Sequence, residues 1–313
     1  MGGLVQNAPA RWMEIAEKGT RLGVATVLLL GRILGRRGMR LVLALVALYY
    51  ALFHGTVRRS STAYLTRALG RPARFGDVWR QVRTFAEVTY DRVAFLRGRV
   101  AGLELVSHGG FRHLEAQRAT GRGALLLGAH LGSFEAMRAR SEARDLPVHA
   151  LVYERHARMV NRFLRGLSPT LASRLIAIDP ASPQWLLTVQ ERIEAGQLVA
   201  LLGDRPDLNG KQATVEFLGA PARFPTGPYV IAALLRCPIY FTVGPYTPPG
   251  RYDFHCEPLF ERVELPRGRR DEALQAYAQR YAARLEEACR AAPYNWFNFH
   301  DVWAPAAPAR GRA

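Results

Sequence analysis

The sequence predicts an α/β fold with a mixed, partly parallel β-sheet flanked by helices. From about residue 102 onward, short apolar runs alternate with longer segments whose apolar residues recur at three- and four-residue steps. The first pattern is typical of buried strands and the second of amphipathic helices. Alternating strands and helices favour parallel strands joined by crossover helices. With 313 residues, of which 49% are hydrophobic, the chain is long enough to bury a substantial core.

Residues 1–56 are expected to form a helical, membrane-associated segment. Two apolar runs, 22–34 and 41–53, are each shorter than the roughly 20 residues of a spanning helix. Between and within them, basic residues recur every four positions at Arg32, Arg36 and Arg40. One continuous helix would therefore carry a basic stripe beside its leucines. We expect this helix to lie in a membrane interface, or to cross at its apolar end, with the arginines on anionic headgroups. The alternative is a buried helical hairpin with a solvated arginine edge.

Residues 57–303 are expected to form one globular domain, and the Pro/Ala/Arg-rich residues 304–313 a flexible tail. Residues 57–100 are predicted to be helical, because Val78, Val82 and Val93 fall on one helical face. The strands predicted next are 123–129, 148–153, 175–178, 197–202, 213–217, 238–243 and 253–256. The helices predicted between and after them are 133–144, 159–167, 183–195, 227–236 and 271–290.

The charge balance predicts a polyanionic partner. Lys and Arg number 43 against 26 Asp and Glu, which gives a net charge of +17, and the only lysines are Lys18 and Lys211. A surface this basic attracts either an anionic membrane or a nucleic acid. The sequence contains no recognised DNA- or RNA-binding motif, and its apolar N-terminal segment fits a membrane protein better. We therefore expect anionic membrane lipids as partners and no nucleic acid.

No resident cofactor or metal is expected. The cysteines Cys237, Cys256 and Cys289 match neither a zinc-ribbon nor a C-x-x-C spacing. The glycine-rich stretches lack the G-x-G-x-x-G and P-loop spacings that bind nucleotide phosphates. Buried, reduced cysteines in a cytoplasmic environment are the expectation.

The candidate catalytic residues are His130 and Glu135, in the segment G-A-H-L-G-S-F-E. A histidine followed five residues later by a carboxylate also occurs at His149 and Glu154, but that pair belongs to a predicted strand, where a five-residue step separates the two faces. His130 instead lies where a buried strand ends and a helix begins, and functional sites gather at this edge of α/β sheets. A tight turn at Gly132 would return Glu135 to His130.

This pair would perform general-base catalysis. The carboxylate of Glu135 would hold the Nδ1 proton of His130, leaving Nε2 free to take a proton from an alcohol that attacks a thioester. No Ser or Cys nucleophile is required, and Ser133 is expected to cap the following helix. With water in place of the alcohol, the same site would be a hydrolase. The non-catalytic alternative is a structural histidine near a capping glutamate.

Several short sequence motifs follow one another along the chain in the order found in a known protein family. Besides G-A-H-L-G-S-F-E, they are Trp12 with Glu17 and Gly19, Arg58-Arg59 with residues 85–96, Val152-Tyr153-Glu154-Arg155 with Asn161, Leu202-Gly203-Asp204-Arg205 with Phe217-Leu218-Gly219, Phe224-Pro225-Thr226-Gly227-Pro228, and the segment 295–300. In this order they resemble the lipid A biosynthesis late (lauroyl/myristoyl) acyltransferase family, within the lysophospholipid acyltransferase superfamily. The resemblance spans nearly the whole chain and implies a glycerolphosphate-acyltransferase-like fold for residues 57–303.

The resemblance also implies roles for individual residues. His130 would be the general base and Glu135 its orienting partner in the H-x-x-x-x-E motif. Arg155 would hold a phosphate or phosphopantetheine group, because a guanidinium suits bidentate contact with an oxyanion. Trp296 and His300, in the W-x-x-H ending, are expected to be structural.

Four more residues are implied as substrate-binding. Asp204 and Arg205 would line the cleft at a strand end, although Arg205 stands where the family usually has an amide. Thr226 and Gly227 would open a helix whose N-terminus can face an anion.

The activity implied by the resemblance is transfer of a fatty acyl chain from an acyl thioester to a lipid hydroxyl, at the cytoplasmic face of a bacterial inner membrane. The resemblance implies acyl carrier protein rather than coenzyme A as the donor, and such an acidic carrier would suit the basic surface. A lipid A-like glycolipid of lipopolysaccharide biosynthesis is the favoured acceptor, and phospholipids or other membrane lipids are alternatives. A thioesterase or lipid hydrolase, and a basic nucleic-acid-binding protein, are the alternatives from other classes.

Overall fold

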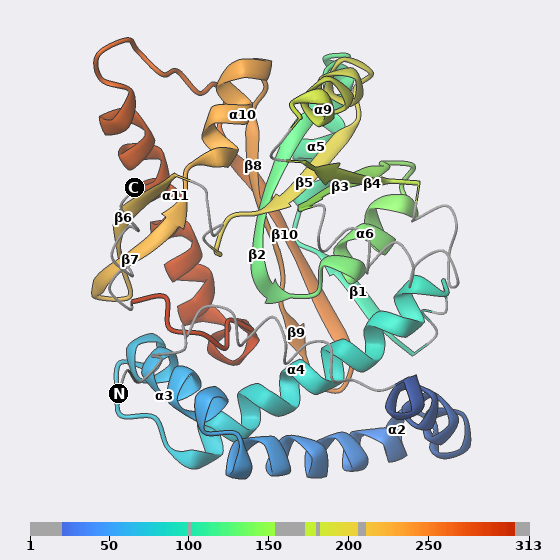
Figure 1. Cartoon of the computed structure of the whole chain (residues 1–313). Helices are drawn as coiled ribbons and strands as arrows, with labels where there is room; N and C mark the ends of the chain where they lie inside the picture. The colour runs from blue at the N-terminus through green and yellow to red at the C-terminus, as the bar shows by residue number, and fades with distance from the viewer. Residues whose placement is uncertain are drawn as a thin grey trace, which may run out of the picture.

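The computed structural model describes residues 21–98, 100, 102–153, 173–179, 182–205 and 211–303, without the side chains of residues 21–29, 32 and 153. This part of the chain has the predicted α/β architecture, with an eight-stranded sheet between two layers of helices and three N-terminal helices packed along one end (Figure 1).

The sheet is largely parallel. In spatial order its strands are β1 (Glu104–Ser107), β10 (Arg251–Phe260), β8 (Ile239–Gly244), β2 (Ala124–Gly132), β5 (Leu198–Leu202), β3 (Val148–Tyr153) and β4 (Leu175–Ile178), and β9 (Tyr246–Thr247) pairs with β10. The pairings of β10 with β8 and with β9 are antiparallel. All six residues of β8 are buried, as expected for a central strand covered on both faces. A separate antiparallel hairpin consists of β6 (Gln212–Phe217) and β7 (Ala220–Pro225).

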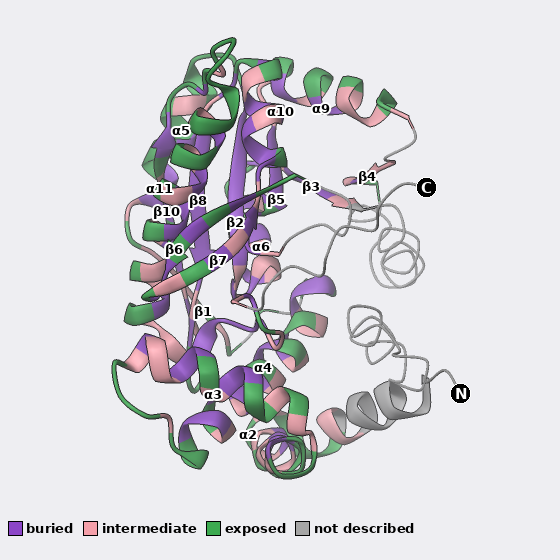
Figure 2. Cartoon of the chain, turned by 60° about the vertical axis from the view of Figure 1, so that its left-hand side comes forward, coloured by how far each residue is buried: buried purple, intermediate pink, exposed green. Residues whose placement is uncertain are grey.

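Helices cover both faces of the sheet, so that the strands form the buried centre of the molecule (Figure 2). One layer holds α9 (Gln184–Glu194), α10 (Gly227–Leu235) and α11 (Arg270–Ala291), which pack on Leu125 and Leu127 of β2. The other holds α5 (Gly110–Ala119) and α6 (Phe134–Glu142), which pack on Leu126. This division follows from the alternation of side chains along a strand.

The predicted elements after residue 102 are confirmed to within a few residues, except that 159–167 lies outside the described residues. The elements not predicted are β1, α5, β7, the two-residue strand β9 and a short 3-10 helix at Pro293–Asn295. The hairpin strand β7 contains Pro221 and Pro225, and proline within a run argues against a strand.

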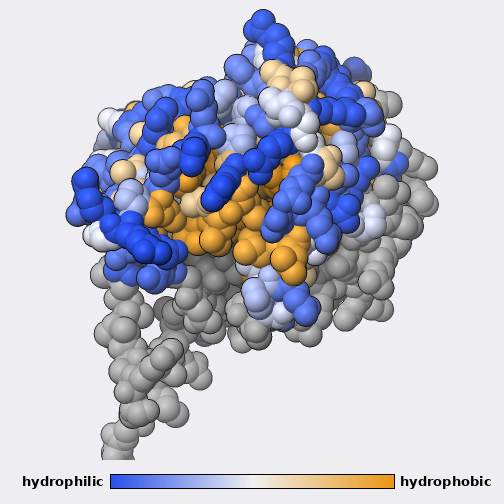
Figure 3. Space-filling model, turned by 90° about the horizontal axis from the view of Figure 1, so that it is seen from above, coloured by the Kyte–Doolittle hydropathy of each residue, from blue (hydrophilic) through white to orange (hydrophobic). Residues whose placement is uncertain are grey.

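The surface seen from above carries an apolar area surrounded by hydrophilic side chains (Figure 3). Helices α9 and α10 lie at this end of the molecule, and their residues Leu187 and Leu234 are 61% and 63% exposed. Exposed leucines are therefore not confined to the N-terminal helices.

Three helices form the N-terminal part of the described chain: α2 (Arg21–Phe53), α3 (Gly55–Leu69) and α4 (Phe75–Leu96). The two predicted apolar runs lie in α2, which is kinked at Gly35 (φ 62°). Within the described residues, no single helix is long and apolar enough to span a membrane. The segments Ile33–Phe53 and Gly55–Leu69 are together long and apolar enough to do so, but a 94° bend separates them. The division of the chain at residue 56 stays a prediction.

The basic stripe on α2 points into the protein rather than away from it. Arg36 is ion-paired with Asp91 at 2.6 Å, and Arg40 lies 3.4 Å from Glu87; both carboxylates are on α4 and are 2% exposed. Buried carboxylates require cationic partners: Arg36 supplies one for Asp91, and Arg40 shares Glu87 with Arg83 of α4, which lies at 2.9 Å. The prediction that Arg36 and Arg40 face lipid headgroups is therefore wrong, and the side chain of Arg32 lies outside the described residues.

The opposite face of α2 is apolar and exposed. Leu41, Leu45 and Phe53 are 72%, 69% and 70% exposed, and Tyr49 lies on the same face. In water an amphipathic helix normally buries its apolar face. Helix α2 does bury Met39, Leu43, Ala47 and Ala51, but it leaves a second apolar face exposed.

Candidate active site

The carboxyl end of β2 is shaped by a bulge and a glycine. The register between β2 and β8 shifts between Gly128 and Gly132, a type of irregularity that re-aims side chains near functional sites. Gly132 has φ +76°, and a Cβ there would lie 1.8 Å from the carbonyl oxygen of Gly244, so the turn requires glycine. Ser133 then caps α6, because its Oγ accepts a hydrogen bond from the amide of Ala136 at 3.1 Å. The predicted cap is confirmed, whereas the strand runs on to Gly132 and the following residues do not bring Glu135 to Nδ1 of His130.

The imidazole of His130 is held by Asp204. Its Nδ1 lies 2.8 Å from Oδ1 of Asp204, and the backbone N–H of His130 donates to Oδ2 at 2.9 Å. The pairing follows from the sheet: Gly128 of β2 is in register with Leu202 of the neighbouring parallel strand β5. His130 and Asp204 each follow two residues later, and therefore meet at the same edge.

Asp204 is fully buried and has further partners. The indole N–H of Trp296 donates to Oδ2 at 2.8 Å, and the side-chain amide of Asn298 donates to the backbone carbonyl of Asp204 at 3.1 Å. Both carboxylate oxygens thus have donors, as a buried carboxylate requires. The sequence predicts substrate contact for Asp204, whereas the structure places its carboxylate against Nδ1 of His130.

Glu135 is directed elsewhere. Its carboxylate forms an ion pair with Arg92 of α4, whose side chain is 55% exposed. The prediction that Glu135 holds the Nδ1 proton of His130 is therefore wrong, because the carboxylate at that atom belongs to Asp204. The reason is that Glu135 is in the first turn of α6, on the side that faces α4. A catalytic role for Glu135 stays a prediction.

The electrostatics favour a neutral imidazole beside an ionised carboxylate. Burial lowers the pKa of His130; the charge of Asp204 opposes this effect, and the charges of Arg205 and Arg92 reinforce it. For Asp204, burial would raise the pKa, but His130 and Arg205 outweigh it and lower the pKa to about 2. With its Nδ1 proton donated to Asp204, His130 carries a lone pair on Nε2, and its side chain is 26% exposed. The site can therefore accept a proton at neutral pH.

Arg205 ties the site to the C-terminal segment. Its Nε donates to Oδ1 of Asn298 at 2.8 Å, and its Nη2 donates to the carbonyl of Phe297 at 3.1 Å. His300 is close enough to the site for its pKa to respond: burial lowers it to about 4, and the charge of Arg205 contributes to the shift. A substrate contact for Arg205 stays a prediction.

The other predicted binding residues are not joined to the His130–Asp204 pair by any described contact. The hydroxyl and amide of Thr226 both donate to the carbonyl of Lys211 at 3.0 Å, and Gly227 is the exposed first residue of α10. Arg155 lies outside the described residues. The binding roles of all three stay predictions.

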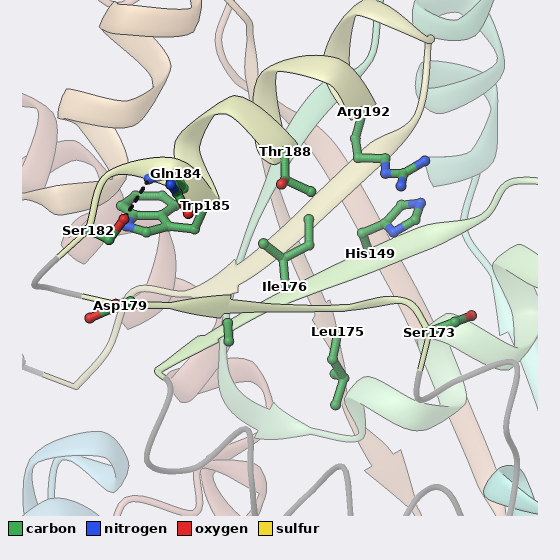
Figure 4. Close-up of a pocket in the computed structure, with 11 residues that line it drawn as sticks. His149, Ser173, Leu175, Ile176, Asp179, Ser182, Gln184, Trp185, Thr188 and Arg192 are labelled. Carbon is green, nitrogen blue, oxygen red and sulfur yellow. Dashed lines mark hydrogen bonds between the residues drawn. The ribbon is translucent and has the colours of Figure 1, made fainter.

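A cavity of about 350 Å³ lies away from these residues, between α9 and strands β3 and β4 (Figure 4). Trp185, Thr188 and Arg192 of α9 face His149 and Ile176 across it. None of the predicted site residues is among its described lining residues. Among all the residues that the structure describes, no group of three or more His, Cys, Asp or Glu side chains could hold a metal ion. The expectation of no resident cofactor stays a prediction.

A carboxylate-bound histidine lies at the carboxyl edge of the parallel strands, where functional sites of α/β proteins gather. The model of the bacterial lipid A biosynthesis acyltransferase family matches residues 18–304, and the chain belongs to this family. The resemblance seen in the sequence is thereby confirmed. A phosphatidylinositol mannoside acyltransferase of Mycobacterium tuberculosis is 26% identical over 160 residues, which cover 50% of this chain and 48% of that protein. The chain thus spans about half the length of this curated relative.

Proposed function

We propose that this protein transfers a fatty acyl chain from an acyl thioester to a hydroxyl of a membrane lipid, with His130 as general base. The observation that carries the proposal is the hydrogen bond from Nδ1 of His130 to the buried carboxylate of Asp204 at 2.8 Å. It fixes the tautomer in which Nε2 is the proton acceptor. Family membership supplies the reaction class.

The reaction needs no covalent enzyme intermediate. Nε2 of His130 takes the proton of the acceptor hydroxyl while its oxygen forms a bond to the thioester carbonyl carbon. The tetrahedral intermediate collapses, the carbon–sulfur bond breaks, and the imidazolium returns its proton to the departing thiolate. Asp204 stays ionised throughout and stabilises the imidazolium, in keeping with its pKa of about 2.

A lipid A-like glycolipid is the favoured acceptor, because the family is that of lipid A biosynthesis. The mycobacterial relative, which acts on a phosphatidylinositol mannoside, supports a phospholipid-type acceptor as the alternative. Acyl carrier protein is favoured as donor, since an acidic partner complements a chain with a net charge of +17. Acyl coenzyme A is the alternative donor.

We further propose that the outward face of α2 binds the cytoplasmic leaflet of the bacterial inner membrane. The exposed Leu41, Leu45 and Phe53 would enter the acyl region, and each fully buried side chain contributes about 1.5–3 kcal/mol. The exposed Arg58 and Arg59 at the start of α3 would meet anionic headgroups. The inward ion pairs of Arg36 and Arg40 would hold the helix in this orientation.

Product analysis tests the reaction. The purified chain is incubated with radiolabelled acyl carrier protein or acyl coenzyme A and with bacterial lipid extracts, and the products are separated and identified by mass spectrometry. The expected result is label in a lipid ester. Label released as free fatty acid, with or without an acceptor, would identify a hydrolase instead. No consumption of either donor would refute the acyltransferase proposal.

A further inference from the structure

The C-terminal segment 295–298 encloses the His130–Asp204 pair from one side. Trp296 forms an antiparallel bridge with Leu131, and the amide of Phe297 donates to the carbonyl of His130 at 2.8 Å. These contacts hold the backbone of the segment against the end of β2. They place the indole of Trp296 and the amide of Asn298 on opposite parts of Asp204.

The two oxygens of the Asp204 carboxylate have different partners. Oδ1 accepts from Nδ1 of His130, whereas Oδ2 accepts from the backbone N–H of His130 and from the indole N–H of Trp296. The backbone bond alone leaves Oδ2 with a single donor in a fully buried place. Trp296 therefore supplies a second, side-chain donor that fixes the rotation of the carboxylate.

We propose that Trp296 is a positioning residue for acyl transfer: its indole N–H fixes the carboxylate of Asp204, which in turn orients the imidazole of His130. The proposal rests on the proposed function, in which His130 is the base. It assigns a role in the reaction to a residue that the sequence suggested was structural.

Trp296 is itself held rigidly. It is fully buried, its ring packs against Tyr64 and Phe217 at centroid distances of 4.7 and 5.4 Å, and its carbonyl accepts a hydrogen bond from the side chain of Gln81 on α4 at 2.7 Å. A donor held on all sides can keep its acceptor within the narrow range of orientations that a preorganised site requires. The chain of contacts runs from Gln81 through Trp296 and Asp204 to His130.

Loss of the indole N–H would have two effects. The Asp204 carboxylate would gain freedom to rotate, so fewer molecules would hold His130 in the reactive orientation, and kcat would fall with little change in KM. The carboxylate would also carry more negative charge toward the imidazole, because one donor is missing. The imidazolium would be stabilised, and the acidic limb of the pH–rate profile would move to higher pH.

The test compares Trp296→Phe with the matched control Trp303→Phe. Trp303 belongs to the same aromatic cluster, with its ring 6.4 Å from that of Trp296, but its indole donates to the backbone carbonyl of Phe217 at 3.0 Å. We expect Trp296→Phe to lower kcat about tenfold to a hundredfold, as is typical when a residue that orients a metal-binding histidine is lost. The acidic limb of the pH–rate profile should move to higher pH. Trp303→Phe should change neither.

A kcat and an acidic limb equal to those of the wild type in folded Trp296→Phe would overturn the proposal. Should Trp296→Phe not fold, β-(benzothien-3-yl)alanine at position 296 keeps the ring shape and loses the N–H, and the same two readouts apply. ¹⁵N NMR of the His130 ring gives a readout that needs no turnover: the midpoint of the ring's titration should move to higher pH when the indole N–H is lost. An unchanged midpoint would refute the positioning role, whereas absence of transfer in the wild type would instead refute the proposed function.

Discussion

Replacement of Asp204 with Asn should disable the site while leaving its shape almost intact. If the Asn oxygen stays on Nδ1 of His130, its NH₂ group faces two donors, the backbone N–H of His130 and the indole N–H of Trp296. Two buried donors without acceptors cost about 1–3 kcal/mol each, or about 2–6 kcal/mol together. The amide should therefore flip and donate to Nδ1. This selects the tautomer that has its proton on Nε2 and cannot act as the base.

The energy difference of about 2–6 kcal/mol corresponds to a loss of roughly 30-fold to 10⁴-fold in kcat/KM. The assay is initial-rate acyl transfer, accompanied by thermal unfolding to show that the variant is folded. Asp253→Asn is the matched control, because Asp253 also accepts from a histidine, His108, at 2.8 Å on β10. Folded Asp204→Asn with less than a threefold loss would refute the assignment of Asp204 as the partner of His130.

Three further predictions follow from the same structure. First, the acidic limb of kcat/KM should lie below pH 6.5, because the reaction needs neutral His130 and burial lowers the pKa of this residue. Activity is then lost only as the pH falls through the lowered pKa. A limb above pH 6.5 in a pH–rate profile would contradict this prediction. Second, Glu135→Gln should reduce kcat/KM less than Asp204→Asn does. It should change the free energy of unfolding by no more than about 1 kcal/mol, since the described ion pair of Glu135 is with the half-exposed Arg92. Initial rates and thermal unfolding measure the two effects, and an equal loss of activity would restore Glu135 as the principal partner of His130. Third, the double variant Leu41→Glu with Leu45→Glu should weaken sedimentation with anionic vesicles at least tenfold. The control Leu187→Glu with Leu234→Glu changes similarly exposed leucines on α9 and α10 and should not weaken it. Equal sedimentation of the two double variants would exclude α2 as the membrane-binding face.

The core of the fold was predictable because its strands and helices have distinct periodicities. The short apolar run of β2 is typical of a buried strand, and the long amphipathic pattern of α11 is typical of a helix. The alternation of such strand and helix patterns along the chain indicates a parallel sheet. Strand β1 and helix α5 were missed because neither has a strong pattern: the four residues of β1 include none that is buried, and α5 is mostly polar.

The orientation of α2 could not be predicted from its own residues. Periodicity shows that Arg36 and Arg40 share a face, but not whether that face looks inward. The answer depends on Asp91 and Glu87, about 50 residues later in the chain, whose buried carboxylates attract the two arginines.

The active site was predicted in part for a similar reason. His130 was found from its local context, a strand end followed by a turn and a helix. Its partner Asp204 lies 74 residues away in the sequence. Only the adjacency of β2 and β5, with Gly128 opposite Leu202, brings the two side chains together. The eight-residue motif indicates the nearby Glu135 as the partner of His130, whereas the order of strands in the sheet brings Asp204 to that position.

The most direct test of the account is the rate of acyl transfer by His130→Ala, measured in single turnover with the donor and acceptor identified by product analysis. His113→Ala, on the exposed surface of α5, is the control. The account predicts a loss of at least about 10²–10⁴-fold for His130→Ala, as expected when an essential base is removed, and none for the control. Transfer by folded His130→Ala within tenfold of the wild-type rate would contradict the central claim that His130 is the general base.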